Sequence, residues 1–168
     1  LTGFKNSFII AIGATFCTVF FSSLTAYGLS VYDFKIKDAA FTFILAVMMV
    51  PMQVTSVGFL EFMIKLGLND SFIPLIVPAI AAPPIVFFMR QYMKSSFPLE
   101  IVEAARIDGC SLYRTYFSIV MPLLKPAMAT LTIMLTFQIW NDYLMASLFV
   151  SNKQLKTLTV AMQSLFSQ

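Results

Sequence analysis

The sequence predicts an all-α integral membrane protein, a polytopic helical bundle with about four membrane spans in its 168 residues. Hydrophobic residues make up 59% of the chain and charged residues 11%, whereas an ordinary soluble domain carries about 25% charged residues. The charges gather in a few stretches that separate long uncharged runs. Each run approaches or exceeds the ~20 residues that a helix needs to cross a bilayer.

The first expected span covers residues 6–32, between Lys5 and Asp33. Small residues recur in its second half, and small residues allow close helix packing in lipid. They could face a partner span or a neighbour in the same chain, and the sequence leaves both open. These residues are Ser22, Ser23, Thr25, Ala26 and Gly28.

The second expected span covers residues 39–60 and contains Pro51. A proline in mid-span breaks the helical hydrogen-bond ladder, and the freed backbone groups then need other partners. Gln53 is therefore either an amide facing a pore or a partner of a freed carbonyl.

The third and fourth expected spans cover residues 72–89 and 123–150. Four prolines in the third predict a bent or broken helix, and Arg90 and Lys94 mark its exit. Asp142 interrupts the fourth span, and ionisable residues at membrane depth usually face a cavity or a partner.

The charged loop, residues 95–122, predicts a helix–turn–helix hairpin between two spans. Pro98 suits a first helical position, with Ser95 and Ser96 as possible caps. We expect a helix over residues 98–108 that ends at Gly109, because glycine readily adopts the left-handed conformation that terminates helices. A second helix is expected from Ser111 as cap to Pro122.

Basic residues predict the orientation. Loops 33–38 and 90–125 share one side and hold seven Lys and Arg residues, against four on the other side. The positive-inside rule therefore places the charged loop in the cytoplasm.

The charged loop resembles the EAA motif of binding-protein-dependent ABC importer permeases, written EAA-x3-G-x9-I-x-LP. Glu103, Ala104 and Ala105 are followed at this spacing by Gly109, Ile119, Met121 and Pro122. Met121 stands where the motif has leucine, a substitution that conserves volume and apolarity. Further stretches resemble the carbohydrate (maltose-type) branch: MVPMQV at 49–54, KLGLNDS at 65–71, WNDYL at 140–144 and LKTLTVAM at 155–162.

This resemblance implies one ABC type-1 transmembrane domain over residues 1–168, lacking its first and last spans, in the inner membrane of a prokaryote. It implies a companion permease subunit, a cytoplasmic ATP-binding subunit dimer and an extracytoplasmic substrate-binding protein as partners, besides membrane lipid. The loop 95–122 would be the coupling loop. The expected ATPase-coupling residues are Glu103, Ala104, Ala105, Asp108, Gly109 and Pro122. An ion pair between Glu103 and Arg106 within the helix is the alternative reading of this charge.

The translocation route would be lined by polar residues in the spans, and the candidates are Gln53, Gln138, Asn141 and Asp142. An aromatic face and an amide, as at Trp140 and Asn141, are common in sugar sites. The alternative is a Trp belt at the membrane interface, with Asp142 near the surface or joining two helices.

The sequence suggests neither an enzyme nor a nucleic-acid-binding protein. It has no phosphate-cradling G-x-x-x-x-G-K-[ST] motif and no His, and Cys17 and Cys110 do not form a metal-binding pattern. We therefore expect no catalytic residues, cofactor or metal, and ATP hydrolysis in a partner chain. An ion-coupled transporter or channel would need carboxylates at membrane depth, where only Asp142 qualifies. A membrane scaffold would leave the motif spacing unexplained.

Overall fold

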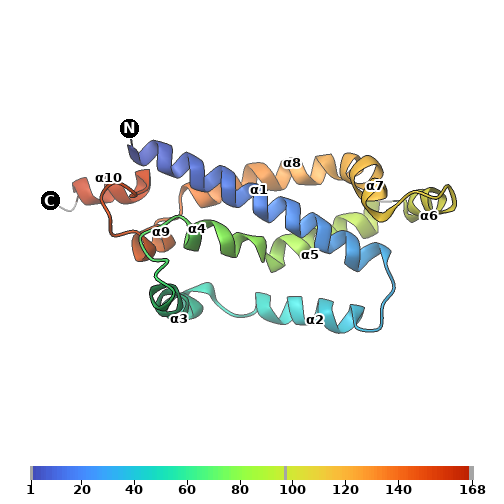
Figure 1. The fold of residues 1–168 in the computed structure, drawn as a ribbon, viewed down its shortest axis with the longest axis horizontal. Coiled ribbons are helices and arrows are strands. Elements are labelled where there is room, and N and C mark those ends of the chain that lie inside the picture. The colour runs from blue at the N-terminus through green and yellow to red at the C-terminus, as the bar shows by residue number, and fades with distance from the viewer. Residues whose placement is uncertain (1, 97, 167–168) are drawn as a thin grey trace. The chain divides into compact units, whose positions relative to one another are not determined.

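The computed structural model describes residues 2–96 and 98–166, in which every regular element is a helix, as predicted (Figure 1). In chain order these elements are α1 (Thr2–Val31), α2 (Lys37–Met48), α3 (Met52–Lys65), α4 (Ile73–Ile76), η1 (Val77–Ile80), α5 (Pro83–Ser96), α6 (Leu99–Ile107), α7 (Leu112–Thr115), η2 (Tyr116–Val120), α8 (Met121–Trp140), α9 (Leu144–Phe149) and α10 (Leu158–Phe166).

Three helical stretches of the described chain are long and apolar enough to cross a membrane. They are Thr2–Val31, Ile73–Ser96 and Leu112–Trp140, and a fourth is present if α2 and α3 together count as one broken span. The predicted number of about four spans therefore includes one that is not a straight helix.

The second span differs most from its prediction, because α2 and α3 are bent by 96° at the break between them. Pro51 caps α3 with an extended backbone, φ −62° and ψ 130°. Its ring disfavours helical geometry at the preceding residue, and it has no N–H to continue the ladder. The interruption that the sequence predicts at Pro51 is thus a complete break between two helices.

The third span is broken, as its prolines predict. It consists of α4, the 3₁₀ turn η1 and α5, and the hydroxyl of Thr18 in α1 donates to the carbonyl of Ala79 at 2.9 Å. This bond satisfies one of the carbonyls in the irregular stretch. α5 continues to Ser96, so Arg90 lies within a helix rather than at its exit. Arg90 is buried, with its guanidinium 3.7 Å from the centroid of the Phe41 ring.

The helix predicted to end at Pro122 and the fourth span are instead one continuous stretch, Leu112–Trp140, which contains Pro122 and Pro126. The segment η2, just before Pro122, is a π-helix. In a regular α-helix the Pro122 ring would clash with the carbonyl four residues earlier, which lies within η2. The widened turn accommodates the proline without ending the helix.

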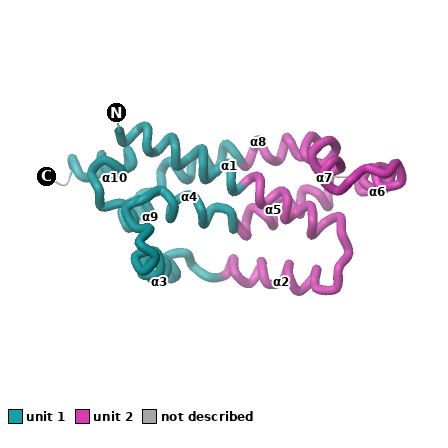
Figure 2. The backbone as a smooth tube through the Cα atoms, viewed as in Figure 1, with its two compact units in different colours: residues 1–18, 50–81, 132–168 teal, residues 19–49, 82–131 magenta. Residues whose placement is uncertain are grey.

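The chain divides into two compact units, coloured separately in Figure 2. Unit 1 comprises residues 1–18, 50–81 and 132–168, and one of its apolar clusters is formed by Met63, Met145 and Phe149. Unit 2 comprises residues 19–49 and 82–131, and contains the charged loop. Ser22, Ser23 and Ala26 are fully buried in unit 2, so these small residues pack against neighbours in the same chain.

Candidate functional site

The helix predicted in the charged loop is present as α6, bounded by Pro98 as N-cap and Asp108 as C-cap. Gly109 has φ +74°, and its N–H donates to the carbonyl of Arg106 while that of Cys110 donates to Ala105. This pair of bonds is the Schellman arrangement that ends many helices, and it confirms the predicted stop. Ser95 is not a cap of α6: its hydroxyl donates to the Tyr92 carbonyl, in the last turn of α5.

Two faces of α6 differ sharply in exposure. Val102 and Ala105 are buried within unit 2. Glu103, Ala104 and Asp108 are exposed, and the Ile107 side chain is 86% exposed. Of the two alanines predicted to allow close approach of a partner, the structure leaves only Ala104 on the open face, and Ala105 packs against its own chain.

Arg106 is directed to a neighbour other than Glu103. Its guanidinium carbon lies 4.6 Å from the centroid of the Tyr32 ring, a cation–π contact. Among the described residues an ion pair joins Lys37 to Asp33, and none joins Arg106 to Glu103. The intrahelical alternative is therefore not adopted, and the Glu103 carboxylate is exposed on the open face.

The second half of the hairpin begins as predicted. The Ser111 hydroxyl accepts the N–H of Arg114 at 3.3 Å and so caps α7. Leu112 and Tyr113 are exposed, the latter by 79%. Pro122 is exposed inside the long helix, further along than the hairpin itself.

The predicted route residues occupy three positions in unit 1. Gln53 lies in the first turn of α3, where its side chain is exposed and makes no hydrogen bond to another described residue. Gln138 is exposed near the end of α8. Asn141 and Asp142 lie in the break between α8 and α9, and the structure describes no contact that joins them to Gln53.

The break after α8 is stabilised by local bonds. The Asp142 carboxylate accepts the N–H of Met145 at 3.1 Å, and the Asn141 amide donates to the Phe137 carbonyl at 2.8 Å. Trp140 packs edge-to-face on Phe4, with centroids 5.3 Å apart. Asp142 therefore bonds the first turn of α9 from the position before its N-cap, Tyr143.

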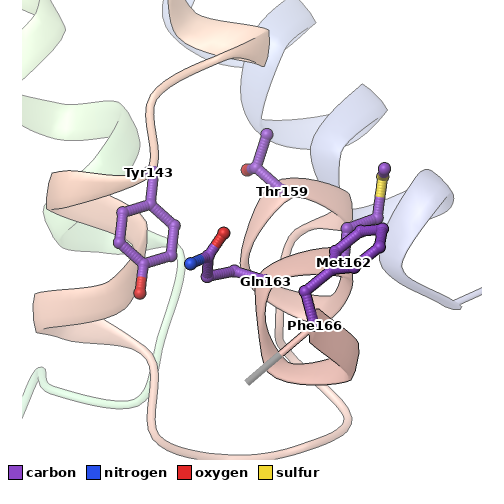
Figure 3. A pocket seen from close by; sticks show the side chains of 5 residues that line it. All are labelled: Tyr143, Thr159, Met162, Gln163 and Phe166. Atoms are coloured by element: carbon purple, nitrogen blue, oxygen red, sulfur yellow. The ribbon is translucent and has the colours of Figure 1, made fainter. Parts of the chain in front are cut away.

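A shallow hollow of about 250 Å³ lies between the start of α9 and α10. Figure 3 shows the Gln163 amide between the ring of Tyr143 and the side chains of Met162 and Phe166. Thr159 completes the lining. Tyr143, Thr159 and Met162 belong to the stretches WNDYL and LKTLTVAM that resemble the carbohydrate branch, whereas Gln163 and Phe166 lie outside every motif of the sequence.

The sequence also did not predict two groups of hydrogen-bonding contacts. The hydroxyls of Tyr116 and Ser23 lie 2.7 Å apart, and those of Tyr27 and Tyr32 lie 2.9 Å apart. In unit 1, Asp70 has φ +54°, and its carboxylate accepts two backbone N–H groups of the turn after α9. An aspartate at a loop apex signals a turn, but its distant partners cannot be read from the sequence.

Residues 18–166 match the family model described as binding-protein-dependent transport system inner membrane component. The chain is 37% identical to the arabinooligosaccharides transport system permease protein AraQ of Bacillus subtilis, over 98% of this chain and 58% of that protein. It is 35% identical to the melibiose/raffinose/stachyose import permease protein MelC of Bacillus subtilis, over 98% of this chain and 60% of that protein. It is 33% identical to the sn-glycerol-3-phosphate transport system permease protein UgpE of Pectobacterium atrosepticum, over 96% of this chain and 57% of that protein.

The fold matches a solved structure as well. A crystal structure of a bacterial ABC transporter involved in the import of the acidic polysaccharide alginate superposes with a TM-score of 0.86 at 25% identity, over 97% of this chain and 57% of that chain. The chain spans about three fifths of the length of the curated relatives that it matches.

Proposed function

Because the chain belongs to the family of binding-protein-dependent transport system inner membrane components, we propose that it is a transmembrane permease subunit of an ATP-driven importer of sugars or oligosaccharides. Its helices, its candidate spans and its likeness to a solved ABC transporter all fit this role. Its relatives are named transport permeases, so the chain is a transporter subunit rather than an enzyme.

The observation that carries the proposal is the exposed face of α6. It presents an acidic residue, Glu103, beside a small residue, Ala104, and an apolar one, Ile107. Arg106 is engaged by Tyr32, which leaves Glu103 available to a basic group of a partner. A short helix with a small residue at its centre fits a groove on a second protein.

In this proposal residues 1–168 form one transmembrane domain, and 95–122 is its coupling loop on the cytoplasmic side. The loop docks on one subunit of a separate ATPase dimer. Glu103, Ala104 and Asp108 contribute the contact, Ala105 and Gly109 hold the helix in place, and Pro122 lies behind it in the long helix. Closure of the ATPase dimer moves the docked helices and changes the side to which the route is open.

The transported solute is proposed from the relatives, two of which are named for oligosaccharides. Gln53, Gln138, Asn141 and Asp142 offer amides and a carboxylate for hydroxyl groups. A companion permease subunit and an extracytoplasmic binding protein complete the assembly. Proteoliposomes that hold this complex should take up raffinose or arabinotriose with ATP inside, and glycerol 3-phosphate is the matched comparison.

The first test is co-purification of the ATPase with the full-length permease, the companion permease being co-expressed. Wild type should retain the ATPase, and Glu103→Lys should lose it because the substitution reverses a charge on the docking face. Glu61→Lys is the matched control, since it makes the same change at an exposed residue of α3. Retention by Glu103→Lys would remove Glu103 from the docking surface.

An ion-coupled transporter makes a different prediction. A folded wild-type permease that retains no ATPase, and whose transport collapses with the proton gradient, would favour that function. The structure lends it little support, because the Asp142 carboxylate is engaged by the N–H of Met145.

A further inference from the structure

The contacts of unit 2 form a continuous series from α6 into the spans. Arg106 of α6 stacks on Tyr32, the residue after α1. The Tyr32 hydroxyl is 2.9 Å from that of Tyr27, and the two rings meet edge-to-face with centroids 5.4 Å apart. The Tyr27 ring then lies 5.3 Å from the ring of Tyr116 in η2.

The inner end of the series is buried. Tyr116 is 2% exposed and Ser23 is fully buried. The Ser23 hydroxyl donates to the Phe20 carbonyl at 2.8 Å, so the bond between the two hydroxyls is donated by Tyr116. Tyr116 thereby joins the π-helical start of the last long span to the middle of α1.

We propose that Arg106 and Tyr32 are positioning residues that make α6, residues 19–31 of α1 and η2 move as one body when the ATPase closes. The inference rests on the proposed function, because it concerns how movement of the docked helix reaches the spans. Arg106 makes the contact on the loop side, and Tyr27 and Tyr116 extend the series of contacts into the spans.

The geometry of α6 favours a positioning role for the Arg106–Tyr32 contact over a merely stabilising one. α6 is a helix of nine residues with its own termination at Gly109, and its covalent connections are the loops at its two ends. Val102 and Ala105 bury its inner face, and the Arg106–Tyr32 contact joins it directly to the residue that follows the 30-residue helix α1. A stacked guanidinium holds an orientation as well as a distance.

The test is a distance measurement between α6 and the end of α1 in the full complex of both permeases and the ATPase. Spin labels are placed at Cys110 and at Lys35→Cys, with Cys17→Ser and all cysteines outside these residues replaced. Distances are recorded without nucleotide and after trapping with MgATP and vanadate. In the otherwise wild-type protein, one narrow distance should persist in both states.

Tyr32→Leu removes both the ring under Arg106 and the hydroxyl that meets Tyr27. We expect it to retain the ATPase on purification but to give a distance that broadens or shifts on trapping. Tyr32→Phe keeps the ring and should behave nearly as wild type. Tyr92→Leu is the matched control, since Tyr92 is also half-buried and has no ring contact described in unit 2.

The outcomes separate the two proposals. If Tyr32→Leu retains the ATPase and its distance stays narrow and unchanged on trapping, the inference is overturned while the proposed function stands. If the wild-type complex retains no ATPase, the proposed function fails first. A shift seen equally in Tyr92→Leu would assign the effect to general loosening and would also overturn the inference.

Discussion

The carboxylate of Asp70 accepts the backbone N–H of Ser151 at 2.6 Å, across 81 positions of the chain. The same oxygen accepts the N–H of Asn152 at 2.9 Å, and the N–H of Asp70 donates to the Phe149 carbonyl at 3.0 Å. One side chain thus joins the loop after α3 to the turn after α9. These bonds explain why Asp70 keeps a left-handed backbone, at φ +54°.

Replacement of Asp70 by alanine should lower the free energy of unfolding by about 1–3 kcal/mol, because two charge-assisted bonds are lost. Asp70→Asn should cost less, since asparagine keeps an acceptor and tolerates the left-handed region. Asp33→Ala is the control: it breaks an exposed pair with Lys37 at 2.9 Å, worth about 0.3–0.5 kcal/mol. Thermal unfolding of the purified permease in detergent measures all three, and equal shifts for Asp70→Ala and Asp33→Ala would contradict the assignment.

The bond between Tyr116 and Ser23 should respond asymmetrically to truncation from its two ends. Tyr116→Phe leaves Ser23 bonded to the Phe20 carbonyl, so about 0.5–1.5 kcal/mol should be lost. Ser23→Ala leaves a buried tyrosine hydroxyl without its partner and should cost about 1–3 kcal/mol. The double variant should cost less than the sum of the singles, and strict additivity in the unfolding midpoints would show that the two hydroxyls do not interact.

Two glycines differ in backbone conformation but share open surroundings, since a Cβ at Gly109 or Gly58 would meet nothing within 4 Å. Gly109 has φ +74°, so Gly109→Ala should cost about 1–2 kcal/mol in backbone strain. Gly58 lies inside α3, where Gly58→Ala should stabilise by about 0.5–1 kcal/mol. Gly109→Ala should also weaken ATPase retention, because the turn sets the direction of α6. The melting temperature of the permease should fall for Gly109→Ala and rise for Gly58→Ala.

Substitutions at Asp142 test whether this residue stabilises the start of α9 or lines the translocation route. Asp142→Asn keeps the oxygen that accepts the Met145 N–H, and should leave folding nearly unchanged. Asp142→Ala loses it and should cost about 1 kcal/mol, as for other side chains that bond the first turn of a helix. Uptake of raffinose by Asp142→Asn at the wild-type rate would limit Asp142 to its bond with the Met145 N–H, whereas a loss of uptake with intact folding would place its charge in the route.

The sequence predicted those features that depend on neighbouring residues. The stop at Gly109 and the cap at Ser111 follow from local backbone preferences, and both are confirmed. The breaks at prolines were located correctly where they interrupt the third span. The family resemblance and the helical membrane fold are confirmed by the comparisons.

Other features depend on contacts between distant segments, which cannot be read from the sequence. The sequence predicts a helix end at Pro122, but the π-helical turn before it lets the helix continue. The sequence predicts that Arg90 marks the exit of the third span, but in the structure Phe41 from another helix covers its guanidinium. The partners of Asp70 and Arg106 come from distant segments, so only the folded chain identifies them.

The break between α2 and α3 also bears on how this segment enters the bilayer during synthesis. The two halves are 12 and 14 residues long, each shorter than the ~20 residues that a crossing helix needs. Neither half is long enough to cross the hydrocarbon core by itself, and irregular backbone such as the break between them is costly in lipid until another segment covers it. We therefore expect stable integration of this segment to depend on neighbouring helices that cover the break.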